Sequence, residues 1–130
     1  MKQFQKFLAV GALGFIVDFS VLYIAVNAAG LGTLTGRVVS FLVAATVTWK
    51  ANRHFTFAGT GAEAPGAAAR QWLRYLSTTA IGGAVNIGVY TLWLRMTDHG
   101  NTNLFLAVVA GSAVALLVNF SLSKYIVFRR

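Results

Sequence analysis

The stretch KFLAVGALGFIVDFSVL (residues 6–22) carries only two charges, its opening Lys6 and one carboxylate, Asp18, in an otherwise largely apolar run. A second stretch, RYLSTTAIGGAVNIGVY (residues 74–90), repeats this pattern, and in the alignment of the two stretches Asn86 corresponds to Asp18. A cation, an aromatic residue, a glycine and a mid-helix polar residue all recur in register. Any two membrane helices share a small alphabet, but the recurring polar positions favour a true internal repeat over this alternative.

The following segment of each unit repeats as well. SFLVAATVTWKANRHFTF (residues 40–57) aligns with GSAVALLVNFSLSKYIVF (residues 111–128) and pairs Thr48 with Asn119. Because each unit contains two helices, both halves enter a membrane in the same sense. We therefore predict a pseudo-twofold axis along the membrane normal.

The composition indicates a membrane protein. Hydrophobic residues make up 57% of the 130 residues and charged residues only 11%, whereas soluble domains are about 45–50% apolar and about 25% charged. Each of four apolar segments is long enough to cross a hydrocarbon core of about 30 Å. These segments lie at roughly 7–28, 34–51, 72–94 and 104–123. The predicted fold is an all-α integral membrane protein with four transmembrane helices in two tandem hairpins.

We expect a single transmembrane domain over residues 1–130. Its parts are hairpin repeat 1 at about 6–57, a connector at about 58–71 and hairpin repeat 2 at about 72–128. The connector AGTGAEAPGAAARQ holds the only proline and is typical of a flexible linker. The first apolar segment follows two lysines, as in a signal peptide, but it is too long for one and lacks a convincing cleavage site.

The basic residues predict the orientation. Nine of the eleven Lys and Arg residues lie at the two termini or beside the connector, and only Arg37 and Arg95 fall at the opposite ends of the apolar segments. The positive-inside rule then places both termini and the connector in the cytoplasm. This placement also explains the net charge of +8 without nucleic acid as a partner.

Asp18 is the strongest candidate for a functional residue. Asp18 and Asn86 each fall about 16 Å into the membrane, near its midplane, on faces that also carry small residues. A carboxylate at that depth costs about 2.5–3.5 kcal/mol, which packing alone does not require. We therefore predict a role in substrate contact for Asp18, against the alternative of a neutral, hydrogen-bonded packing residue.

Further candidates lie on a small or polar stripe of the second and fourth helices. Thr48, Asn52 and Asn119 belong to this stripe, and for Thr48 interhelical packing is the favoured interpretation. Arg37 shares the stripe near the outer end, while Arg53 and Lys124 stand at its inner ends. Cations at both mouths of a polar seam suit an anionic head group, although anchoring at the interface is equally plausible for Arg37 and favoured for the other two.

Three boxes together resemble the GtrA-like family of small four-helix membrane proteins. They are FLAVGALGFIVDFSVLY, NRHFTF and VNFSLSKYIVFR, and in this order they span nearly the whole chain. The resemblance implies a bacterial inner-membrane protein that flips a polyprenyl-phosphate-linked sugar to the outer leaflet during synthesis of a cell-surface polysaccharide or O-antigen. By position, it assigns family roles to Asp18, Asn52, Arg53 and Asn119. The family more often has asparagine at the position of Thr48, and "NR" where this chain has Ser123 and Lys124.

Other functions are weighed against this one. The leading hypothesis is transport of a lipid-linked sugar, and the resemblance also allows a non-transporting scaffold that recruits a glycosyltransferase. A small multidrug-type proton antiporter is disfavoured by the strong charge bias. We expect no enzymatic activity, metal or cofactor, because the chain has no cysteine, no nucleotide-binding loop and no nucleophile beside a base. Four short helices offer little interior, so a homodimer embedded in membrane lipids is predicted.

Overall fold

The computed structural model describes residues 2–59 and 64–129, and this part of the chain is all helical. Four α-helices follow in order: α1 (Gln3–Asn27), α2 (Thr33–Ala51), α3 (Ala67–Met96) and α4 (Asn101–Leu122). Two short π-helical turns, η1 (Asn52–Thr56) and η2 (Ser123–Val127), continue α2 and α4. The predicted all-helical fold with four long helices is thus confirmed.

The helix boundaries follow local chemistry. Gly30 takes a left-handed backbone conformation, with φ of 69°, in the turn between α1 and α2, and glycine tolerates that conformation without steric cost. Helix α3 begins five residues before the predicted apolar segment, because the alanines from Ala67 onward are strong helix formers. Residues 60–63 of the predicted connector lie outside the described residues, and its last five residues belong to α3.

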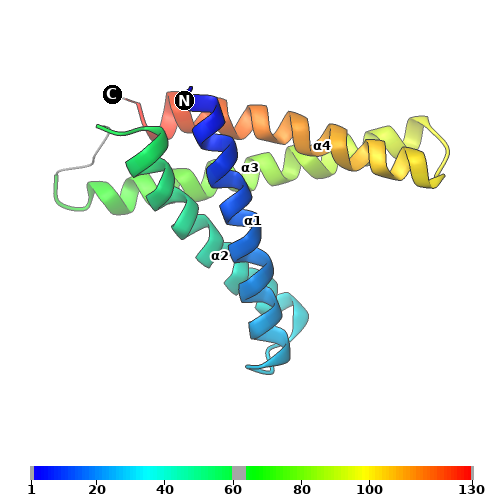
Figure 1. Ribbon diagram of the computed structural model, residues 1–130, viewed down its shortest axis with the longest axis horizontal. Coiled ribbons are helices and arrows are strands. Elements are labelled where there is room, and N and C mark those ends of the chain that lie inside the picture. The colour runs from blue at the N-terminus through cyan, green and yellow to red at the C-terminus, as the bar shows by residue number, and fades with distance from the viewer. Residues whose placement is uncertain (1, 60–63, 130) are drawn as a thin grey trace.

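The helices form two hairpins that together make a V (Figure 1). Helix α1 packs along α2, and α3 packs along α4. The hairpins meet at the end that carries both chain termini, and they diverge towards the two interhelical turns. Contacts between the two hairpins are therefore concentrated at the vertex of the V, and any site built from residues of both hairpins lies there.

An aromatic cluster holds the vertex together. Its buried members are Phe7, Trp49, Phe57, Tyr75, Val127 and Phe128. The rings of Phe57 and Phe128 stack with their centroids 4.8 Å apart and an interplanar angle of 10°. Because these rings come from the ends of η1 and η2, each hairpin contributes one half of the central stack.

The π-helical turns aim these two rings inward. The amide N–H of Phe57 donates to the Asn52 carbonyl oxygen, and that of Phe128 donates to the Ser123 carbonyl oxygen, both at 2.8 Å. In an α-helix a residue five positions on would lie about 140° around the axis. A π turn instead closes its hydrogen bond over five residues and brings the first and the sixth residue closer to one face. A regular helical pattern does not predict this placement.

Two of the four helices are long and apolar enough to cross a bilayer by length and composition alone. They are α1 and the segment Asn101–Val127, which joins α4 to η2. Helix α2 falls short because Arg37 and Lys50 lower its mean hydropathy, and α3 because of Asn86 and several hydroxyl side chains. Large apolar side chains, such as those of Ile87 and Phe105, are exposed, as expected of a membrane protein.

Candidate functional site

A polar cavity of 230 Å³ lies where the two hairpins meet. Every helix and both π turns contribute to its wall. Its polar side chains are Asp18, Thr48, Asn52, Tyr75, Thr79, Asn119 and Ser123. Four of the predicted site residues, namely Asp18, Thr48, Asn52 and Asn119, therefore line one cavity.

Asp18 is held by Arg37 of the neighbouring helix. The Arg37 Nη1 atom donates to Asp18 Oδ2 at 2.5 Å, and the two side chains are 55% and 22% exposed, respectively. The other carboxylate oxygen, Oδ1, is buried and has no hydrogen-bond partner among the residues that the structure describes. An unpartnered buried acceptor is costly, so this oxygen suits a ligand that donates a hydrogen bond.

Asn119 presents a second acceptor of the same kind. Within the described part of the chain, its Oδ1 atom is buried and makes no hydrogen bond. The side chain fills the space that a Cβ atom would need at Gly82. Thr48 fills the equivalent space at Gly14, where its Cγ2 atom would stand 2.5 Å from an added Cβ. The two glycines therefore allow close approach of the helices on either side of the cavity.

Asn52 and Thr48 have their hydrogen bonds satisfied within the protein. Asn52, only 1% exposed, donates from Nδ2 to the Tyr75 hydroxyl at 3.0 Å and accepts at Oδ1 from Thr56 Oγ1 at 2.7 Å. The Thr48 hydroxyl donates to the Ala44 carbonyl oxygen at 2.9 Å. Asn52 thus links η1 to α3 across the vertex, and both residues shape the wall of the cavity.

The remaining predicted residues do not line this cavity. Asn86 faces α4 within its own hairpin, where its Oδ1 atom would lie 2.6 Å from a Cβ added at Gly111. The guanidinium carbon of Arg53 lies 5.6 Å from the centroid of the Trp49 ring. The Lys124 amine lies 5.8 Å and 5.5 Å from the ring centroids of Phe120 and Tyr125, respectively. The repeat pairs Asp18 with Asn86 in sequence, but their surroundings differ.

Sequence reasoning missed three polar lining residues, Tyr75, Thr79 and Ser123, and the ion pair itself. In the sequence, Tyr75 is only the aromatic residue of the second repeat that corresponds to Phe7. Thr79 is one polar residue on the helix face that also carries Gly82. Asp18 and Arg37 carry opposite charges on two consecutive helices that a short turn joins. Such a pair of charges in apolar segments could have indicated a contact across the hairpin.

Comparison with known proteins agrees with this architecture. Residues 6–128 match the family described as GtrA/DPMS, transmembrane domain. The chain belongs to this family. The predicted resemblance to GtrA-like proteins is thereby confirmed over nearly the whole length of the chain.

Distant relatives of this GtrA/DPMS chain carry a functional name. Proteins of the Shigella phages SfX, SfII and SfV are each named bactoprenol-linked glucose translocase. Each is 26% identical to this chain over 129 residues, which is 99% of this chain and 97% of the relative. These relatives are named translocases rather than enzymes, and the match extends over the whole domain.

Proposed function

We propose that this GtrA-like protein translocates a polyprenyl-phosphate-linked sugar from the cytoplasmic to the outer leaflet, for glycosylation of a cell-surface polysaccharide or O-antigen. The observation that carries the proposal is the polar cavity with its two buried acceptors, Asp18 Oδ1 and Asn119 Oδ1, that lack partners among the described residues. Sugar hydroxyls are hydrogen-bond donors and match such acceptors. The relatives named as translocases of a lipid-linked glucose support the same assignment.

Arg37 is the proposed contact for the phosphate. Its planar guanidinium carries five donors, and the bond to Asp18 uses Nη1. Asp18 balances this charge while no phosphate is bound. Arg53 and Lys124, which lie over aromatic rings at the inner ends of α2 and α4, would attract the anionic head group before it reaches the cavity.

The proposed topology has four membrane spans with both termini in the cytoplasm. The distribution of nine basic residues on one side and two on the other supports it. All four helices, at 1.5 Å per residue, approach or exceed the roughly 30 Å needed to cross the hydrocarbon core. With their polar faces turned towards the cavity, α2 and α3 would each span the membrane despite their lower mean hydropathy.

We further propose that the two hairpins are related by a pseudo-twofold axis along the membrane normal. Equivalent contacts in the two halves support this relation. Gly14 meets Thr48 as Gly82 meets Asn119. The edge-to-face pair of Phe7 and Phe57, with centroids 6.3 Å apart, likewise corresponds to that of Tyr75 and Phe128, at 5.9 Å.

We also propose a homodimer, because four short helices offer little interior. Large apolar side chains of the second hairpin, such as those of Ile87 and Leu117, are exposed, and a second copy in the same orientation would bury part of this surface. A glycosyltransferase that uses the flipped sugar is the proposed functional partner. Cross-linking in native membranes tests the dimer, and recovery of monomer alone would refute it.

The translocation proposal is tested in liposomes with a fluorescent polyprenyl-phosphate-linked hexose. We expect the wild type to move the label between leaflets. Asp18→Asn should slow this at least about tenfold, because a hydrogen bond to a charged group is worth about 1.5–3 kcal/mol, and Asn119→Ala should slow it severalfold, because a neutral hydrogen bond is worth about 0.5–1.5 kcal/mol. Asn101→Ala, at the exposed start of α4, is the matched control and should transport normally. A folded wild type without flipping would refute transport and favour the scaffold function.

A further inference from the structure

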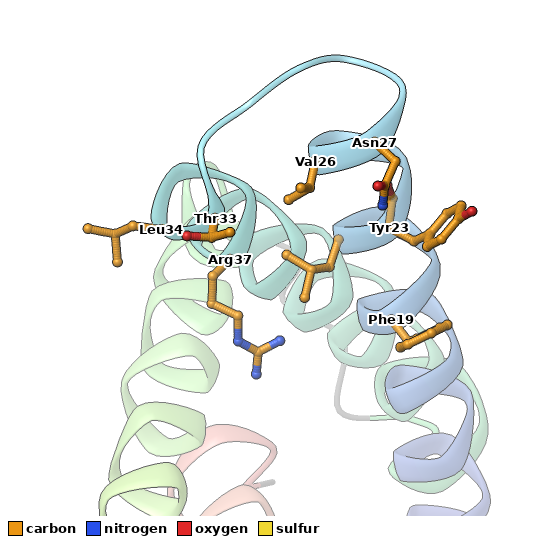
Figure 2. A pocket seen from close by; sticks show the side chains of 8 residues that line it. Phe19, Tyr23, Val26, Asn27, Thr33, Leu34 and Arg37 are labelled. Atoms are coloured by element: carbon orange, nitrogen blue, oxygen red, sulfur yellow. The ribbon is translucent and has the colours of Figure 1, made fainter.

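An apolar groove of 610 Å³ runs between the last turns of α1 and the first turns of α2. Figure 2 shows its lining side chains around the turn that joins these helices. They are Phe19, Leu22, Tyr23, Val26, Asn27, Thr33, Leu34 and Arg37, of which only the last is charged. The groove is separate from the polar cavity at the vertex, and no role described so far uses it.

Arg37 joins the groove to the cavity. It lines the groove, and its guanidinium points away from the interhelical turn (Figure 2). Its partner Asp18 lines the polar cavity. Along the first hairpin the order is therefore polar cavity, cation, apolar groove.

We propose that this groove holds the isoprenoid chain of a polyprenyl phosphate whose phosphate binds Arg37. The proposal rests on the proposed function and adds to it the site for the lipid portion. The three neighbouring environments match the three parts of such a ligand. The sugar would lie in the polar cavity, the phosphate would bind the guanidinium, and the hydrocarbon would lie in the groove. At about 30 Å³ per carbon, close to the volume share of a water molecule, the groove accommodates roughly 20 carbons, or about four isoprene units.

Charge complementarity favours this occupant over a second copy of the chain. Asp18 engages only the Nη1 donor of Arg37, which leaves other guanidinium donors for an anion, and a second copy of this chain has only two acidic residues besides Asp18 to offer them. A lipid phosphate supplies the anion and the apolar chain in one molecule. Its orientation is also consistent with entry from one leaflet. The head would point towards the chain termini, as in a lipid of the cytoplasmic leaflet in the proposed topology.

Photocrosslinking in liposomes tests the proposal. A photoreactive phenylalanine analogue replaces Leu34, which is 79% exposed in the groove, or Val43, which lines an apolar groove of 270 Å³ on α2 whose lining includes no charged residue. The probe is radiolabelled polyprenyl phosphate. We expect at least fivefold more labelling at position 34, competed by unlabelled polyprenyl phosphate but not by phosphatidylglycerol or by uncharged polyprenol.

Charge variants make the test specific. Labelling at position 34 should fall at least fivefold in the double variant Asp18→Asn with Arg37→Gln, which leaves no unpaired charge, and should persist in Arg95→Gln, which alters the other arginine at the turn ends of the helices. Equal labelling at positions 34 and 43, competition by phosphatidylglycerol, or crosslinks from position 34 to a second chain would overturn the proposal.

The same liposomes separate this inference from the function on which it rests. Translocation with no labelling at position 34 would refute the groove site and leave transport standing. Labelling that depends on Arg37, without translocation, would support the lipid site and refute transport.

Discussion

Replacing Gly11 with leucine should block the cavity without disturbing the fold. Gly11 lines the polar cavity, and a Cβ atom added there meets nothing within 4 Å. A side chain at this position therefore extends into open space. The backbone is an ordinary α-helix, where glycine is less favourable than alanine by about 0.8–1 kcal/mol and leucine ranks just below alanine.

The expected size of the effect follows from volume. Leucine adds four carbon atoms, or about 120 Å³ at about 30 Å³ each, which would fill roughly half of the 230 Å³ cavity. The roughly 110 Å³ that remains is too small for a hexose ring with its hydroxyl groups. We expect Gly11→Leu to slow sugar translocation at least about tenfold, with a smaller effect for Gly11→Ala.

The assay is leaflet-to-leaflet movement of a labelled polyprenyl-phosphate-linked hexose in liposomes, with thermal unfolding of the purified protein measured in parallel. Gly88→Leu is the matched control, because Gly88 also has open space around its Cβ position but does not line the cavity. Normal transport by a folded Gly11→Leu protein would refute the assignment of the cavity to the sugar. Equal loss in both leucine variants would show that the effect comes from helix chemistry instead.

Two further predictions concern the second hairpin. Gly82→Ala should destabilise the protein, because the new Cβ collides with the Asn119 side chain, whereas Gly83→Ala, where the space is open, should not; similar denaturation midpoints for the two variants would contradict this. In the turn before α4, hydrogen bonds from the Asn103 side chain and a backbone amide lower the pKa of Asp98. Because the folded pKa lies below the ordinary value, this contribution to stability is present at neutral pH and is lost as the pH falls below about 4. In an NMR titration, Asn103→Ala should raise the pKa of Asp98, and an unchanged pKa would refute the role of this bond.

The sequence predicts the helices and their pairing well because both depend on local patterns. Apolar length gave four segments, and the internal repeat grouped them into two hairpins. The repeat also identified residues that share the vertex, since Asp18, Thr48 and Asn119 all line the cavity there. Periodicity is sufficient for such inferences because it reports which face of a helix is polar.

Other features depend on how helices meet, which periodicity does not report. The pairing of Asp18 with Arg37 requires the register between α1 and α2. Asn86 matches Asp18 in the repeat but packs against Gly111 within its own hairpin, because its neighbour across the interface is a glycine rather than a cation. The π turn that buries Phe57 likewise breaks the periodic pattern on which the prediction relied.

The ion pair also bears on how the protein enters its membrane during synthesis. In the proposed topology, α1 alone would carry the charge of Asp18 into the bilayer, and α2 alone that of Arg37, each at a cost of about 2.5–3.5 kcal/mol. Paired by Nη1 and Oδ2, the two residues bring no net charge. We infer that the unit of insertion is the first hairpin as a whole, so that the insertion machinery must hold α1 until α2 has emerged from the ribosome.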